Sequence, residues 1–271
     1  MSYETISVSK LSPHVGAEIG NIDLTQPLPN RQVEELHRAF AENCVIFFRD
    51  QKISFDDHVR LARYFGELHL HVGPVTSSKA TDENPAIRRQ HFDGNSKRVS
   101  GEVWHTDQSC APIPPMASIL YNHTLPPDGG GDTLFASMYA AYGGLSPRMK
   151  VYLEGLTATH DGRDAFGDGA PVAVHPVIVR HPVTGRKLIF VNGSFTRRIN
   201  ELPRDESAGV LKWLVEHCHK DEWTVRFHWR NHSIAFWDNR CAQHKAIWDY
   251  WPNTRSGYRI QIKGEAAPVA G

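Results

Sequence analysis

The strongest constraint on the fold is a period-two alternation of apolar and polar side chains in the last third of the chain. Val225, Phe227 and Trp229 alternate with basic neighbours, and residues 258–262 repeat the pattern. Successive side chains of a strand point to opposite faces of a sheet, so this pattern predicts half-buried β-strands. The nearly apolar run at residues 233–237 predicts a strand that is buried more completely.

Helices are expected mainly around these strands. Asn30 can cap a first helix. Ser54, with Asp57 three residues on, is expected to cap a second, and Ser146-Pro147 begins a third. A fourth is expected over residues 205–219. Many short strands with a few outer helices predict a mainly β protein with flanking helices, a double-stranded β-helix or jelly roll.

Composition restricts the class of protein. The 271 residues carry no formal net charge and have 40% hydrophobic content. Without a basic field or a long apolar run, the chain is expected to bind neither nucleic acid nor membrane. No linker or repeat divides it, so a single domain over residues 1–271 is expected. Its scattered cysteines predict reduced, mostly buried thiols in a cytoplasmic protein: Cys44, Cys110, Cys218 and Cys241.

The tripeptide His105-Thr106-Asp107 is the most informative candidate for chemistry. In an extended segment, residues two apart share a face, so the imidazole and the carboxylate can bind one metal ion together. A third ligand from a distant strand, His244, would complete a face of two histidines and one carboxylate. Such a face leaves positions open for a cosubstrate and O2, which suits Fe(II). Alone, His105 would more often be a buried structural histidine than a metal ligand.

Two arginines follow His244. Arg255 and Arg259 have the same parity, so in a strand they face the same side. A guanidinium there could bind a cosubstrate carboxylate through two hydrogen bonds, although an isolated arginine more often forms a surface ion pair. Thr133, after a glycine turn, offers a hydroxyl group, but by itself this segment is simply a loop.

Taken together, these motifs resemble the TauD/TfdA (taurine dioxygenase) family of Fe(II)- and 2-oxoglutarate-dependent oxygenases. The resemblance covers nearly the whole chain, and the matching segments occur in the family's order. They are residues 16–24, Phe65-Gly-Glu-Leu-His-Leu-His71, Trp104-His-Thr-Asp107, Gly130-Gly-Asp-Thr133, Trp237-Asp-Asn-Arg240, His244, Arg255 and Arg259.

The resemblance implies a role for each matching residue. The iron ligands would be His105, Asp107 and His244. Thr133 and Arg255 match the positions that hold the distal carboxylate of 2-oxoglutarate, the cosubstrate consumed with O2. The remaining two matches, His71 and Arg259, correspond to contacts with the anionic group of the prime substrate. The resemblance also implies a small-molecule substrate and a homo-oligomer.

Two positions depart from the pattern of the taurine enzymes. Pro74 stands where those enzymes place a tyrosine, and Gly101 where they place an asparagine. Because two polar substrate contacts are missing, taurine itself is disfavoured. A sulfonate, an alkyl sulfate or an aryloxyalkanoate fits the remaining pattern, and the residues do not choose among them.

The sequence also allows other functions for these metal-ligand residues. Two histidines and an aspartate can also hold zinc in a hydrolase, and a non-catalytic metal- or ligand-binding jelly roll is a further alternative. Residues 161–171, rich in glycine and aspartate, are expected to form a mobile loop without a strong period. This loop could act as an active-site lid or be a plain surface loop.

Overall fold

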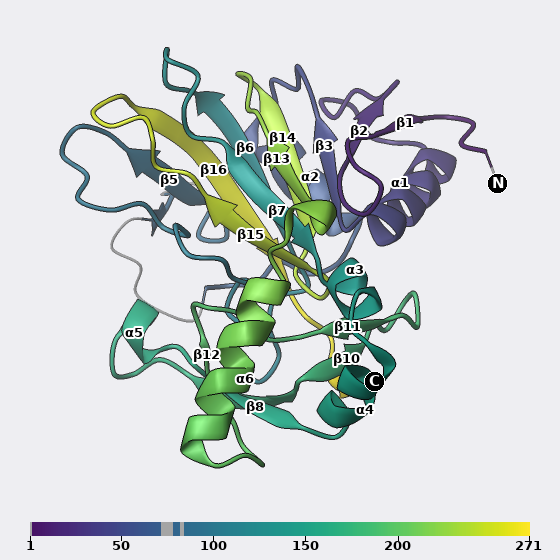
Figure 1. Cartoon of the computed structure of the whole chain (residues 1–271). Helices are drawn as coiled ribbons and strands as arrows, with labels where there is room; N and C mark the ends of the chain where they lie inside the picture. Colours follow the sequence, from purple (N-terminus) through teal and green to yellow (C-terminus); the bar gives the residue numbers. More distant parts are fainter. Residues whose placement is uncertain (1, 72–77, 82–83) are drawn as a thin grey trace.

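A large sheet forms the upper half of the molecule in Figure 1. The computed structural model describes residues 2–71, 78–81 and 84–271. Within that part of the chain the large sheet has eight strands, in the spatial order β1 (Ser7–Lys10), β2 (Ala17–Gly20), β3 (Val45–Phe48), β14 (Ser233–Asp238), β6 (Ala117–Thr124), β16 (Arg255–Ile262), β5 (Arg88–Phe92) and β4 (Ser78–Ala80).

The centre of this sheet is buried on both faces, which explains its continuous apolar runs. In β3, Ile46 and Phe48 join one hydrophobic cluster, whereas Val45 and Phe47 join another. The residues of β14 divide in the same way, and every one of them is buried. Strands covered on both faces lose the apolar–polar alternation of half-exposed strands. The prediction of a buried strand at residues 233–237 is therefore confirmed.

A smaller sheet packs against one face of the large one. In the described chain it has the order β13 (Thr224–Phe227), β7 (Thr133–Ser137) and β15 (Ala242–Ala246), with antiparallel pairing. Aromatic rings fill the interface: Phe47 of β3 stacks on Phe227 of β13 at 3.9 Å, and Phe135 of β7 lies 5.7 Å from Trp237 of β14. The two facing sheets form the predicted jelly roll.

Two helices pack against the other face of the large sheet, α1 (Asn30–Asn43) and α2 (Phe55–Arg63). Ser54 caps α2 as predicted, because its hydroxyl accepts from the Asp57 N–H and the Asp57 carboxylate accepts from the Ser54 N–H. The predicted cap at Asn30 is wrong. The helix begins one residue earlier than expected, with Asn30 as its first residue. Pro29, whose backbone is extended, therefore occupies the cap position, and no side chain caps the helix.

The lower half of Figure 1 holds the remaining elements. Its helices are α3 (Met138–Gly143), α4 (Pro147–Leu153), α5 (Arg163–Phe166) and α6 (Arg204–His217), and the 3₁₀ turn η1 (Asp221–Trp223) follows α6 and leads into β13. Its strands pair as β12 (Thr196–Ile199), β8 (Thr157–Asp161) and β9 (Val172–Pro176), and as β11 (Lys187–Ile189), β10 (Ile178–Arg180) and β17 (Val269–Ala270).

The expectation of an irregular loop at residues 161–171 is wrong in part. The segment joins β8 to β9 and contains the single helical turn α5. The Asp161 carboxylate accepts hydrogen bonds from the N–H and the guanidinium of Arg163, which orders the start of this turn. No helix in the described ranges has both the length and the apolar character needed to cross a lipid bilayer.

Candidate metal and cosubstrate site

Backbone hydrogen bonds bring the two candidate histidines together. The N–H of His105 donates to the carbonyl of His244 at 3.1 Å, and the reverse bond measures 2.9 Å. This reciprocal pair is an isolated antiparallel bridge between the segment before β6 and strand β15. The two imidazole rings consequently lie 4.1 Å apart between their centroids, although 139 positions separate them in the sequence (244 − 105).

The carboxylate of Asp107 faces both rings. Its Oδ1 lies 3.5 Å from His105 Nε2 and 3.9 Å from His244 Nε2, and the potential ligand atoms of all three residues lie within 4.8 Å of one another. The Nδ1 of His105 is 2.8 Å from the Val103 carbonyl. Because a carbonyl only accepts, Nδ1 carries the proton, and the lone pair of Nε2 is available to a metal ion.

Electrostatics hold the cluster in the protonation state that a metal requires. Burial by itself raises the pKa of the Asp107 carboxyl, but the positive charge of Arg259 and the neighbouring imidazoles bring this pKa well below its usual 3.8. Burial and the proximity of His105 lower the pKa of His244 well below 6.5. Asp107 is therefore ionised and His244 neutral, the forms that bind metals.

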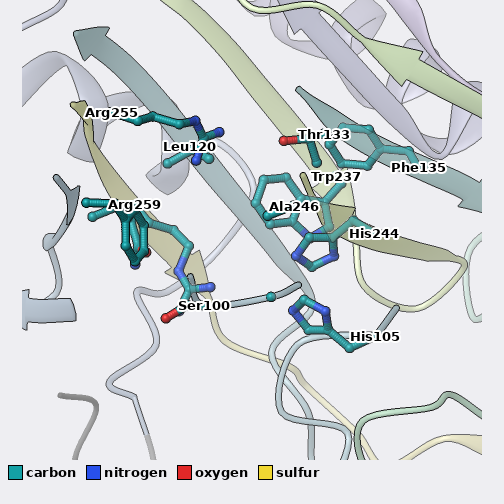
Figure 2. Close-up of a pocket in the computed structure, with 13 residues that line it drawn as sticks. Ser100, His105, Leu120, Thr133, Phe135, Trp237, His244, Ala246, Arg255 and Arg259 are labelled. Carbon is teal, nitrogen blue, oxygen red and sulfur yellow. The ribbon is translucent and has the colours of Figure 1, made fainter. Parts of the chain in front are cut away.

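A small cavity extends from His105 and His244 to Thr133 and Arg255. Figure 2 shows both at the end of the cavity away from His105. Arg255 is 4% exposed, and its Nε and Nη2 have no hydrogen-bond partner among the described residues. Burial lowers the pKa of this guanidinium below its usual 12.5. The hydroxyl of Thr133 accepts from the indole of Trp229 at 3.0 Å, which leaves its proton free to donate into the cavity.

A second, larger cavity of about 570 Å³ shares His105 and Arg259 with the small one, whose volume is about 60 Å³. Its lining includes Asp107 and His71, and the ring of His71 contacts Phe166 of α5 at 5.1 Å. Arg259 lies between the cavities, where its Nη1 donates to Asp107 Oδ1 at 3.2 Å. All seven residues selected from the sequence therefore lie around two adjoining cavities.

Comparison with known proteins identifies the family. A family model described as "Taurine catabolism dioxygenase TauD, TfdA family" matches residues 7–261. The chain belongs to this family. The family expected from the sequence motifs is confirmed, and the protein is an alpha-ketoglutarate-dependent dioxygenase, an oxidoreductase that uses 2-oxoglutarate (alpha-ketoglutarate) and O2.

The chain matches known relatives over most of the length of each relative. The alpha-ketoglutarate-dependent sulfonate dioxygenase of Saccharomyces cerevisiae is 33% identical, covering 96% of this chain and 67% of the yeast protein. The alkylsulfatase of Acinetobacter baylyi is 30% identical, covering 98% and 88%. The crystal structure of a taurine dioxygenase from Burkholderia xenovorans superposes with a TM-score of 0.87 at 34% identity, covering 98% and 93%.

Of the two residues that depart from the taurine pattern, Pro74 and Gly101, the structure describes only Gly101. Pro74 lies outside the described residues. Gly101 lines both cavities and has a positive φ of 82°, and a Cβ added there would lie 2.9 Å from Cε1 of His105. Glycine therefore lets the backbone approach the imidazole ring closely in this dioxygenase.

Several residues at these cavities were missed by the sequence reasoning. Gln90 is buried and lines both of them, but its short strand β5 was not recognised. Phe166 and Phe195 lie at the larger cavity and contact each other at 5.7 Å. The indole of Trp229 holds Thr133, as its parity in the alternating strand pattern could have suggested.

A second group of metal-ligand residues is already saturated by hydrogen bonds. His181, Asp238 and Cys241 have ligand atoms within 4.8 Å of one another. The Nδ1 of His181 accepts from two backbone N–H groups, so its Nε2 donates to Asp238 at 3.1 Å. The same carboxylate accepts two hydrogen bonds from the guanidinium of Arg240. We therefore interpret this cluster as a buried hydrogen-bond and ion-pair network with a structural role.

Proposed function

We propose that His105, Asp107 and His244 bind Fe(II), and that the protein hydroxylates a small organic anion, most specifically a sulfonate or a sulfate ester. With 2-oxoglutarate and O2, iron supplies an oxidant that inserts one oxygen atom into a substrate C–H bond and yields succinate and CO2. The observation that carries the proposal is the convergence of these three ligands beside a buried arginine, Arg255, whose Nε and Nη2 have no hydrogen-bond partner among the described residues.

The donor set supports iron. Two neutral imidazoles and one carboxylate on one side of an ion leave positions on its other side for a cosubstrate and O2. The Val103 carbonyl fixes the tautomer of His105, and Trp237 packs against the ring of His244 at 4.6 Å. These contacts keep both Nε2 atoms directed toward Asp107.

The small cavity supports the role of Thr133 and Arg255 in holding 2-oxoglutarate. A buried guanidinium with unpaired N–H groups favours a carboxylate, because two charge-assisted hydrogen bonds would compensate for its lost hydration. The free proton of Thr133 adds a third donor at the same end. A dicarboxylate can therefore be held at one end by these residues and reach the metal ligands with the other.

The larger cavity supports an anionic prime substrate. Arg259 and His71 supply a cation and an imidazole near the metal ligands, and Phe166 and Phe195 supply apolar contacts. Two further arginines, Arg98 and Arg163, and two further carboxylates, Glu102 and Asp164, also line this cavity, so the cation next to the metal ligands is Arg259. The residues thus orient a molecule with an anionic head and an apolar body. Hydroxylation of the carbon that bears sulfur or an ester oxygen would release sulfite or sulfate and leave a carbonyl compound.

The remaining expectations belong to the same proposal. We infer that residues 1–271 form a single dioxygenase domain. The contact of Phe166 with His71 supports a lid function for residues 161–171, because it places this segment over the larger cavity. We also propose a cytoplasmic location, which agrees with the reduced, buried cysteines. A homo-oligomeric state is proposed because the resemblance to the family implies it.

Anaerobic metal binding tests the proposed site. Fe(II) with 2-oxoglutarate should give a weak visible charge-transfer band in the wild-type protein, and air should then yield succinate. The Asp107→Ala variant should lose the band, whereas Asp161→Ala, which removes a surface carboxylate partner of Arg163, should keep it. A full band in Asp107→Ala would remove Asp107 from the ligand set.

A substrate panel tests the proposed substrate class. Alkyl sulfonates, alkyl sulfate esters and aryloxyalkanoates of matched size should be compared by the substrate-dependent formation of succinate, with sulfite, sulfate or phenol as the second product. We expect the sulfonates or sulfate esters to give the highest kcat/KM. Turnover confined to the aryloxyalkanoates would refute this assignment but leave the reaction type intact.

A further inference from the structure

Ser118 is a buried serine in strand β6, at the centre of the large sheet and in contact with the metal-ligand carboxylate. Its side chain is fully buried, and its Oγ lies 2.6 Å from Oδ2 of Asp107. The other carboxylate oxygen, Oδ1, is the one that faces both imidazole Nε2 atoms. The two oxygens of Asp107 therefore have different partners.

Two amide groups determine the direction of the serine proton. The Nδ2 of Asn239 and the Nε2 of Gln261 each lie 3.1 Å from Ser118 Oγ. Since both donate, they occupy the acceptor capacity of the hydroxyl oxygen. The proton of Ser118 is then donated to Asp107 Oδ2, because an ionised carboxylate only accepts.

The orientation of each amide is fixed in turn. The indole N–H of Trp237 can only donate, and it lies 3.0 Å from Asn239 Oδ1, so the Nδ2 of Asn239 must face Ser118. The Nε2 of Gln108 donates to Gln261 Oε1 at 2.7 Å, which turns the amide nitrogen of Gln261 to the serine. All of these side chains are at most 3% exposed. A buried hydrogen-bond network of this kind favours one arrangement of its side chains.

We propose that Ser118 is a positioning residue that presents Oδ1 of Asp107 to the metal and keeps Oδ2 away from it. The inference rests on the proposed function, since it requires a metal ion between His105, Asp107 and His244. Second-layer hydrogen bonds commonly orient metal ligands in this way. With two imidazoles and one carboxylate oxygen, an octahedral ion keeps three further positions. A carboxylate that rotated to bind through both oxygens would leave only two, and O2 would lose its place beside bidentate 2-oxoglutarate.

The test counts the water molecules on bound Mn(II), with no turnover required. Wild-type protein, Ser118→Ala and Ser233→Ala are titrated with Mn(II) alone, and bound water is counted from the broadening of the Mn(II) spin-resonance lines in ¹⁷O-enriched water. Ser233 is the matched control, because it is also fully buried in the large sheet and its Oγ also accepts two hydrogen bonds, from Arg49 and Arg230.

We expect Ser118→Ala to hold one water fewer than wild type, or to bind Mn(II) about 10- to 100-fold more weakly. Ser233→Ala should match wild type in both measurements. If Ser118→Ala does not fold, Ser118→Cys fills the same space with a weak donor and should give the same change.

An unchanged water count, together with an affinity within threefold of wild type, would overturn the role of Ser118 and leave the metal site standing. Equal effects in the Ser233→Ala control would overturn it as well. If wild-type protein binds no Mn(II), the proposed metal site fails, and the role of Ser118 fails with it.

Discussion

Arg255→Ala should separate the binding of 2-oxoglutarate from the stability of the ligand-free protein. In the free protein Arg255 is buried, and two of its nitrogens are unpaired. The ring of Trp229 lies 5.3 Å from the guanidinium carbon and contributes about 1 kcal/mol, and the Tyr250 hydroxyl and the charge of Asp132 favour the guanidinium in addition. Since removal of the side chain also removes an unpaired buried charge, the free energy of unfolding should change by no more than about 1 kcal/mol.

The effect on 2-oxoglutarate should be much larger. Truncation of a buried guanidinium that pairs with a carboxylate through two hydrogen bonds weakens the binding free energy of the carboxylate by about 2–4 kcal/mol. This corresponds to a Kd for 2-oxoglutarate that rises about 30- to 1000-fold. At a concentration 100 times the wild-type Kd, 2-oxoglutarate stabilises the wild-type protein by about 2.7 kcal/mol, whereas a Kd raised 100-fold reduces this to about 0.4 kcal/mol.

Urea unfolding of the Mn(II)-loaded protein under anaerobic conditions, with and without 2-oxoglutarate, measures both quantities. Arg259→Lys is the control, because Arg259 lies on the same face of β16 but is assigned to the prime substrate, and lysine keeps the positive charge beside Asp107. Stabilisation of Arg255→Ala by 2-oxoglutarate to the wild-type extent would refute the assignment. So would a large loss of stability in the absence of 2-oxoglutarate, because Arg255 would then have a structural partner.

Two further variants test the active site, one tests a buried histidine of the core, and one tests a helix cap. Arg259→Ala should raise KM for the prime substrate at least tenfold and change the 2-oxoglutarate Kd less than threefold; interchanged effects of the two arginines would show that their roles are reversed. Gly101→Ala should weaken Mn(II) binding and lower stability by about 1 kcal/mol, because alanine is strained at a φ of 82° and its Cβ would lie 2.9 Å from His105; wild-type Mn(II) affinity would contradict this. Burial lowers the pKa of His58 from 6.5 to about 4, so the unfolded chain binds this proton more readily and stability falls as pH falls from 6.5 to 4, by about 2 kcal/mol between pH 7 and 5; His58→Phe should lose that part of the pH dependence in urea unfolding, and an unchanged profile would exclude His58 as its source. Ser54→Ala should lower the free energy of unfolding by about 1 kcal/mol because the α2 capping box is lost, with Mn(II) binding unchanged as its control.

The parts of the fold that follow local rules could be predicted from the sequence. The alternation of Val225 and Phe227 gives β13, and the Ser54 capping box gives the start of α2. The cap at Asn30 failed because the sequence alone did not place the first turn, and Pro29 took that position. The turn α5 was missed because its order depends on the contact of Asp161 with Arg163, within a segment whose composition is typical of a loop.

The site divides in the same way. His105 and Asp107 could be selected because residues two apart form a recognisable pair, and the arginines because their parity places them on one face of β16. Ser118 could not be selected, since it stands in an apolar strand and its role depends on residues from three other segments: Asp107, Asn239 and Gln261. Only a fold that brings these segments together distinguishes it from an ordinary core serine.

The site lies between the two sheets and is built from residues that each sheet provides or holds in place. His244 belongs to β15 of the small sheet, whereas Asp107 is held by Ser118 of β6 in the large sheet. Thr133 begins β7 of the small sheet, and Arg255 begins β16 of the large one. A metal ion bound here would connect His244 of the small sheet to Asp107, which the large sheet holds. A dicarboxylate would connect Thr133 of the small sheet to Arg255 of the large one. Any relative movement of the sheets would separate the ligands, so the aromatic packing between the sheets, such as Phe135 against Trp237, also positions the candidate metal site.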